Sequence, residues 1–212
     1  MKRTFDLCAA VVGLLVLLPL FAAIALVVKA YDGGPVFFRQ ERVGRRGRPF
    51  RIWKFRTMVP DAERLGGLLT VGGDRRVTPV GQWLRRHKLD ELPQLLNVLA
   101  GEMSLVGPRP EVPKYVALYT PEQRRVLELT PGITDPGSLA YVNESELLAN
   151  SAEPERTYVL HVMPDKLRRN LEYAAIASVR TDVGVILSTI RNLLRAPTPE
   201  ARAPLTTRGP AV

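Results

Sequence analysis

Residues 7–28 read LCAAVVGLLVLLPLFAAIALVV, a run of 22 residues without a charged or strongly polar side chain. At about 1.5 Å per residue the run would form a helix of roughly 33 Å, enough to cross the core of a bilayer. Pro19 interrupts it, because proline lacks a backbone donor and clashes with the preceding turn. Lys2 and Lys29 flank the run, and positive flanks favour the cytoplasmic side of a membrane. A helix that enters, breaks near Pro19 and returns satisfies both flanks, so we favour a re-entrant membrane helix over residues 1–30.

Two other interpretations of this run stay open. A kinked transmembrane anchor is one, since proline is tolerated in such helices. A signal peptide is the other, although 22 residues exceed the usual signal core of about 7–15. The only cysteine, Cys8, lies inside the run, so no intrachain disulfide can form. A body that faces the reducing cytosol is therefore the simpler expectation.

Composition limits the class of partner. A length of 212 residues suits one domain plus a membrane element. The net charge of +9 and the pI near 10.1 imply an anionic partner. Nucleic acid, an anionic membrane surface and a phosphorylated substrate all qualify, and charge alone does not choose among them.

Residues 35–56 predict a β-hairpin. Aromatic-rich stretches at 35–40 and 49–56 surround GRRG at 44–47, a turn by composition. Eight basic residues and one acidic residue lie between positions 39 and 56. Such a run is usually a solvated face, but beside a membrane element it suits anionic lipid or substrate phosphate. No nucleic-acid-binding motif accompanies it, so we expect no nucleic-acid partner.

The stretch RRHKLDELPQ at 85–94 carries the candidate chemistry. Thr78 followed by proline predicts a helix that runs to about Arg86. Asp90 is expected to cap a second helix that ends at Gly101, with Glu91 in its first turn. The predicted buried side of this second helix consists of Leu92, Leu95, Leu96 and Leu99.

An Asp-Glu pair at a helix start usually has no further role, but the neighbouring cations suggest one here. A carboxylate can attack phosphorus only if the repulsion between two anions is neutralised by arginine, lysine, a helix N-terminus or Mg²⁺. Mg²⁺ suits such a site, because it accepts one or two carboxylates together with substrate phosphate oxygens.

Several motifs in a fixed order carry a resemblance. They are FFRQERVG at 37–44, KFRTM at 54–58, LDELPQ at 89–94, NVL at 97–99, GEMSLVGPRP at 101–110 and PGIT at 131–134. Together they resemble the bacterial sugar transferase family, the monotopic phosphoglycosyl transferases, over roughly residues 2–194. The match covers the catalytic core of the small members of that family.

The resemblance implies an Mg²⁺-dependent transfer of a sugar-1-phosphate from a UDP-sugar to undecaprenyl phosphate, with release of UMP. Carried over, Asp90 is the nucleophile that forms a covalent phosphosugar intermediate, and Glu91 binds the metal or positions the lipid phosphate. Asp90 and Glu91 are the expected Mg²⁺ ligands. Phosphate or nucleotide contacts are expected from Arg109, Lys54, Arg56, Arg76 and Arg86.

The expected fold class is α+β: a monotopic membrane protein with a re-entrant broken helix, a small β-hairpin and a mostly helical cytosolic catalytic domain over residues 31–196. The expected location is the cytosolic face of the inner membrane, in contact with membrane lipids, and a homo-oligomer stays possible. Two departures from the family stand out. Leu18 replaces the serine that commonly precedes the breaking proline, and DPGS at 135–138 follows PGIT, which bears on sugar specificity. The Pro-, Ala- and Thr-rich tail at 197–212 is expected to be disordered.

Overall fold

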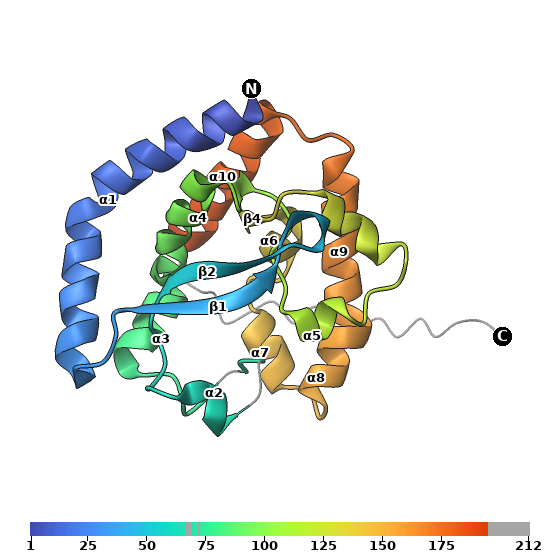
Figure 1. Cartoon of the computed structure of the whole chain (residues 1–212). Helices are drawn as coiled ribbons and strands as arrows, with labels where there is room; N and C mark the ends of the chain where they lie inside the picture. Colours follow the sequence, from blue (N-terminus) through green and yellow to red (C-terminus); the bar gives the residue numbers. More distant parts are fainter. Residues whose placement is uncertain (67–68, 72, 195–212) are drawn as a thin grey trace.

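The computed structural model describes residues 1–66, 69–71 and 73–194 (Figure 1). It contains both helices and strands, with helices predominating. The predicted tail at 197–212 lies outside the described residues. The division into segments 1–30 and 31–196 remains a prediction.

The apolar run forms most of a single helix, α1, which spans Lys2–Asp32 and contains Pro19. The helix continues through the proline without interruption, and its axis curves around the rest of the molecule (Figure 1). Within the described residues it is the one helix long and apolar enough to cross a membrane. Its middle part is exposed at Leu15, Val16 and Leu18. This surface suits contact with lipid.

Polar contacts tie both ends of α1 to the same body of the protein. At the N-terminal end, buried Asp6 accepts hydrogen bonds from Ser104 Oγ at 2.8 Å and from the Leu105 N–H at 3.2 Å. At the C-terminal end, Asp32 pairs with both terminal nitrogens of the Arg56 guanidinium. The curvature of α1 therefore brings its two ends to one globular unit.

Two small sheets follow α1. Strands β1 (Phe37–Val43) and β2 (Pro49–Phe55) pair antiparallel from Phe37↔Phe55 to Val43↔Pro49, in the region where two strands were predicted. Strands β3 (Ser104–Val106) and β4 (Gly132–Thr134) form a parallel pair that was not predicted. A β-carbon on Gly132 would lie 2.1 Å from the Gly107 nitrogen, so the close approach of these two chain segments requires glycine.

Short helices connect and cover the sheets. In chain order they are η1 (Arg45–Gly47), α2 (Ala62–Leu65), α3 (Pro79–Arg86), η2 (Leu89–Gln94), α4 (Leu95–Ala100), α5 (Pro113–Val116), η3 (Gln123–Glu128), α6 (Pro136–Ala140), α7 (Glu144–Ala149), α8 (Pro154–Thr157), η4 (Tyr158–Val162), α9 (Met163–Ala174) and α10 (Val179–Leu194). Thr78 caps α3 as predicted, since its side chain accepts from the Gly81 N–H at 2.9 Å. Gly101 ends α4 as predicted, with φ of 85°.

Three apolar clusters hold the helices and strands together. One joins α1 to β2 and α4 through Ala10, Ile52 and Val98. A second joins the C-terminal half of α1 to β2 and α3, and the largest packs α5 against η3, η4 and α9. Leu96 is exposed, so its predicted burial is wrong, and α10 leaves Leu187 and Ile190 exposed.

Candidate active site

The Asp90–Glu91 pair lies in the 3₁₀ helix η2, between α3 and α4. Lys88 precedes η2 in a left-handed conformation, and no side chain among the described residues caps its first turn. The prediction that Asp90 caps an α-helix is therefore wrong. Pro93 contributes to the difference, because it is the third residue after Asp90 and has no N–H for a capping carboxylate to accept.

Glu91 is held by two cations that come from distant parts of the chain. Lys54 Nζ on β2 donates to Glu91 Oε1 at 2.7 Å. Arg109, in the loop after β3, donates from Nη1 to Oε2 at 3.1 Å and from Nη2 to Oε1. Burial alone would raise the pKa of Glu91, but the charges of Arg109 and Lys54 and the Arg109 hydrogen bond hold this pKa well below its usual range. Glu91 is therefore a fixed carboxylate ion.

Asp90 has the opposite environment. It is 6% exposed, and its Oδ1 atom is buried without a hydrogen-bond partner in the described part of the chain. Burial raises the pKa of Asp90, and the charges of Lys54, Lys88 and Arg85 only partly oppose this effect. An unpartnered carboxylate among cations is suited to bond to phosphorus or to a metal ion.

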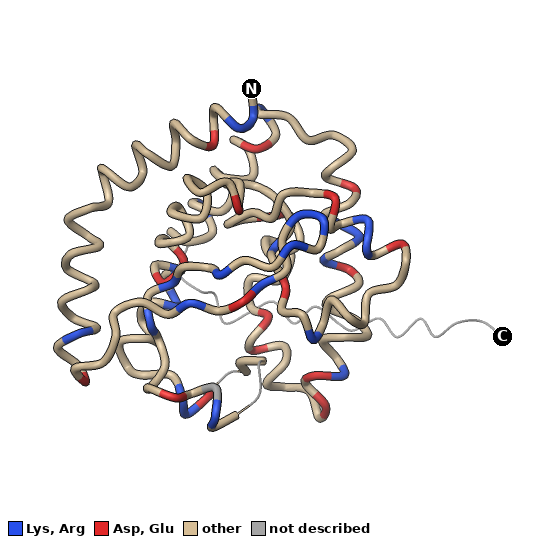
Figure 2. Tube along the Cα trace, viewed as in Figure 1, with Lys and Arg blue, Asp and Glu red and all other residues tan. Residues whose placement is uncertain are grey.

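Arg85 and Arg42 are two further cations of the site that sequence reasoning missed. Arg85 Nε donates to Thr57 Oγ1 at 2.8 Å, and its charge acts on both carboxylates. Arg42 donates to the Pro110 carbonyl at 3.2 Å, while its Nε is buried without a partner in the described part of the chain. Arg85 belongs to the stretch already singled out, whereas Arg42 is one of eight basic residues between 39 and 56, and no local signal selects it. Figure 2 shows these charges along β1 and β2.

Of the sequence-predicted residues, Lys54 and Arg109 meet Asp90 and Glu91, and three others lie elsewhere. Arg56 is buried and bonds to Asp32 and to the Pro35 carbonyl. Arg76 pairs with Asp74 and bonds to the Ala62 carbonyl. Arg86 is exposed, and its side chain makes no hydrogen bond or ion pair to the residues that the structure describes. The ion pairs of Arg56 and Arg76 therefore stabilise other parts of the fold.

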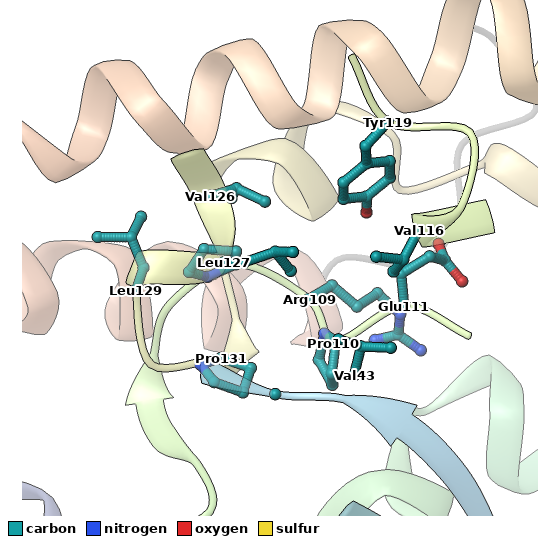
Figure 3. A pocket seen from close by; sticks show the side chains of 12 residues that line it. Val43, Arg109, Pro110, Glu111, Val116, Tyr119, Val126, Leu127, Leu129 and Pro131 are labelled. Carbon is teal, nitrogen blue, oxygen red and sulfur yellow. The ribbon is translucent and has the colours of Figure 1, made fainter. Parts of the chain in front are cut away.

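A pocket lies beside Arg109, between the end of β1 and the segment before β4 (Figure 3). Arg109 and Tyr119 reach it from different segments, and apolar side chains form most of its wall. Glu111, at its edge, accepts from the Arg42 guanidinium and from the Tyr158 hydroxyl. The lining residues are Val43, Gly44, Pro108, Arg109, Pro110, Glu111, Val116, Tyr119, Val126, Leu127, Leu129 and Pro131.

The two carboxylates of the site offer the oxygen ligands that Mg²⁺ prefers. No group of three or more His, Cys, Asp or Glu side chains converges within residues 1–66, 69–71 and 73–194. Mg²⁺ needs only one or two carboxylates when phosphate oxygens and water complete its shell. A carboxylate has about four lone-pair sites. Glu91 uses two on Oε1 and one on Oε2, and Asp90 Oδ1 uses none within the described chain, so both retain a free site.

The chain is similar to known proteins along most of its length. A family described as bacterial sugar transferase matches residues 1–196. The UDP-N-acetylgalactosamine-undecaprenyl-phosphate N-acetylgalactosaminephosphotransferase of Aeromonas hydrophila is 36% identical over 91% of this chain and 43% of its own length. The undecaprenyl-phosphate glucose phosphotransferase of Komagataeibacter xylinus is 40% identical over 90% of the chain and 35% of its own length.

A third relative is the UDP-glucose:undecaprenyl-phosphate glucose-1-phosphate transferase of Escherichia coli, 37% identical over 90% of the chain and 39% of its own length. The chain thus spans less than half the length of these three relatives. The family match nevertheless covers every motif from the N-terminal helix to α10. The chain belongs to the bacterial sugar transferase family.

Proposed function

We propose that this protein transfers a sugar-1-phosphate from a UDP-sugar to undecaprenyl phosphate and releases UMP, as the first membrane step of glycan synthesis. The observation that carries the proposal is the contrast within one pair of carboxylates. Glu91 is neutralised by Lys54 and Arg109, whereas Asp90 beside it is buried and has an oxygen without a partner among the described residues. The names of the three relatives support the substrate classes.

The proposed reaction has two displacements at one phosphorus. The Asp90 carboxylate attacks the β-phosphorus of the UDP-sugar, the bond from that phosphorus to the bridging oxygen breaks, and UMP leaves with the electron pair. Asp90 then carries the sugar phosphate as an acyl phosphate. A phosphate oxygen of the lipid acceptor attacks the same phosphorus, and the bond to Asp90 breaks to regenerate the carboxylate. Two successive displacements through a covalent intermediate constitute a ping-pong mechanism.

The charges around Asp90 support the first displacement. Lys54, Lys88, Arg85 and Arg109 provide four cations against two carboxylates. They reduce the repulsion between Asp90 and the incoming diphosphate, and fixed cations stabilise the charge that develops on the leaving phosphate. Lys54 and Arg109 remain in place because Glu91 holds them.

We also propose Mg²⁺ as the cofactor, held by the free lone pairs of Asp90 and Glu91 and by substrate phosphate oxygens. When bound, the ion would neutralise phosphate charge and favour the departure of UMP. The lone-pair count above supports this proposal. Dialysis against a chelator should abolish UMP release, and Mg²⁺ should restore it.

The attachment of both ends of α1 to one body supports a monotopic topology. A helix that crossed the membrane would place Asp6 and Asp32 on opposite sides, yet both bond to the same globular unit. We therefore propose that α1 dips into the bilayer from the cytosolic face of the inner membrane and returns. A Thr4→Cys variant in a Cys8→Ser background should react with a membrane-impermeant thiol reagent only after the cells are opened. Labelling in intact spheroplasts would contradict this topology.

The central experiment measures UMP release without a lipid acceptor. The purified protein, given Mg²⁺ and a panel of UDP-hexoses and UDP-N-acetylhexosamines, should release about one UMP per protein and then stop. Intact mass spectrometry should find the sugar phosphate on the protein. Asp90→Asn should remove both signals, and exposed Glu155→Gln should retain them. A burst that survives in Asp90→Asn would exclude Asp90 as the nucleophile.

A further inference from the structure

Lys88 has a backbone conformation that its residue type disfavours. It follows His87, the C-cap of α3, and has φ of 55° and ψ of 20°, in the left-handed region. Helices that end in this conformation usually carry glycine or asparagine there, because a β-carbon crowds the following carbonyl. A lysine at such a position calls for a role of its side chain, since strained residues concentrate at functional sites.

The Lys88 side chain differs from the other cations near Asp90. Lys54 is bonded to Glu91, and Arg85 is bonded to Thr57. Lys88 is exposed and makes no side-chain hydrogen bond or ion pair within residues 1–66, 69–71 and 73–194. Its charge nevertheless reaches both carboxylates, and its carbonyl accepts from the Glu91 N–H at 3.4 Å. Lys88 is thus a cation at the site that is available to an arriving anion.

The surroundings of Lys88 point toward the membrane. Leu84 and Leu89, which lie on either side of it in the chain, pack with Ile24 and Val28 of α1. Trp83, on the same helix α3, is 53% exposed. Exposed tryptophan is typical of membrane interfaces, where its apolar ring and its N–H are both satisfied. An anion that reaches Lys88 along α1 and Trp83 comes from the lipid side.

We propose that Lys88 binds the phosphate of the polyprenyl phosphate acceptor and holds it beside Asp90 for the second displacement. This inference rests on the proposed function and adds a residue for its second substrate. Arg109 and Lys54 are already engaged with Glu91, whereas lysine is a mobile point charge that suits a phosphate arriving on a flexible lipid. The bond that forms joins an acceptor oxygen to the sugar-bearing phosphorus, and the bond that breaks joins that phosphorus to Asp90.

The test compares Lys88→Gly with Arg46→Gly in the full chain. Arg46 is an exposed cation with φ of 58° at the tip of the β1–β2 pair, so its substitution also removes a positive charge and relieves a left-handed conformation. Undecaprenyl phosphate in mixed micelles is the acceptor, and the UDP-sugar active in the burst assay is the donor. Loss of a phosphate contact should raise the KM for the acceptor about tenfold in Lys88→Gly. The rate of the UMP burst should fall less than this, because Lys54, Arg85 and Arg109 still act on the two carboxylates. The melting temperature should stay level or rise.

Lys88→Arg should recover most of the acceptor KM, because it restores the charge, and Lys88→Asn should not, although asparagine tolerates this conformation. Equal acceptor KM values in wild type, Lys88→Gly and Arg46→Gly would overturn the inference. So would a loss of membrane binding by Lys88→Gly to phosphatidylglycerol vesicles that contain no acceptor, because that result assigns Lys88 to bulk lipid. If the wild-type protein released no UMP, the proposed function itself would fail, and that outcome is separate.

Discussion

The two adjacent carboxylates should respond to loss of charge with opposite signs of stability. Asp90→Asn replaces a buried carboxylate whose Oδ1 has no partner among the described residues and whose pKa burial raises. Asparagine keeps a carbonyl oxygen at this position but carries no charge. Burying such a group without a partner costs about 1–3 kcal/mol and more when it is charged, so removal of the charge should stabilise the fold by about that amount. For a chain of this size, the melting temperature should rise by about 2–12 °C.

Glu91→Gln removes the negative charge that compensates both Lys54 and Arg109. Breaking a buried pair from one side costs about 3–5 kcal/mol, because the remaining charges lose their compensation. Arg109 is 33% exposed and keeps some solvation, so the lower end of that range is expected. The melting temperature should fall by about 6–12 °C.

The pH dependence separates these effects from general damage. The folded-state pKa of Asp90 lies above its usual 3.8, so wild type loses stability as pH rises from about 3.8 through the folded value. The advantage of Asp90→Asn should therefore be full at neutral pH and shrink as the solution is acidified through that folded value. The folded pKa of Glu91 lies below 4.5, so the deficit of Glu91→Gln should be full above about pH 4.5 and shrink below it.

Differential scanning fluorimetry of detergent-solubilised protein between pH 4 and pH 8 measures both variants in one experiment. An Asp90→Asn protein that melts below wild type at neutral pH would refute the reasoning, because Asp90 would then be a stabilising charge. Equal shifts for the two variants would refute it as well. Glu155→Gln, which alters an exposed ion pair, serves as the control and should melt within about 1 °C of wild type.

Two further substitutions test the elements that position the site. Gly107→Ala should destabilise the loop that carries Arg109 by about 1–3 kcal/mol, because the new β-carbon would lie 2.3 Å from the Thr130 carbonyl oxygen. The resulting displacement of Arg109 should lower kcat/KM for the UDP-sugar by up to about 100-fold. An unchanged kcat/KM would show that the position of Arg109 does not depend on the close approach of Gly107 to Thr130. Thr78→Ala should remove the N-cap of α3 and lower stability by about 1 kcal/mol, whereas Thr78→Ser should retain the cap and remain near wild type in thermal melts.

Local patterns in the sequence were sufficient for the elements whose cause is local. The long apolar run predicts α1, Thr78 predicts the start of α3, and Gly101 predicts the end of α4. The Asp-Glu pair could be singled out because several cations precede it in the chain. Periodicity, capping and composition depend on near neighbours, so they are readable from residues alone.

The tertiary structure decided which cations pair with the carboxylates of the site. Lys54 and Arg109 lie 37 and 18 residues from Glu91, and packing of β2 and of the loop after β3 around η2 selects them from the many basic residues of the chain. The same packing buries Arg56 against Asp32 and leaves Asp90 with an oxygen that has no partner in the described part of the chain. The sequence shows which charged residues are available, but only the fold determines which of them are buried next to one another. That burial, with or without a cationic partner, shifts the pKa values of the two neighbouring carboxylates in opposite directions.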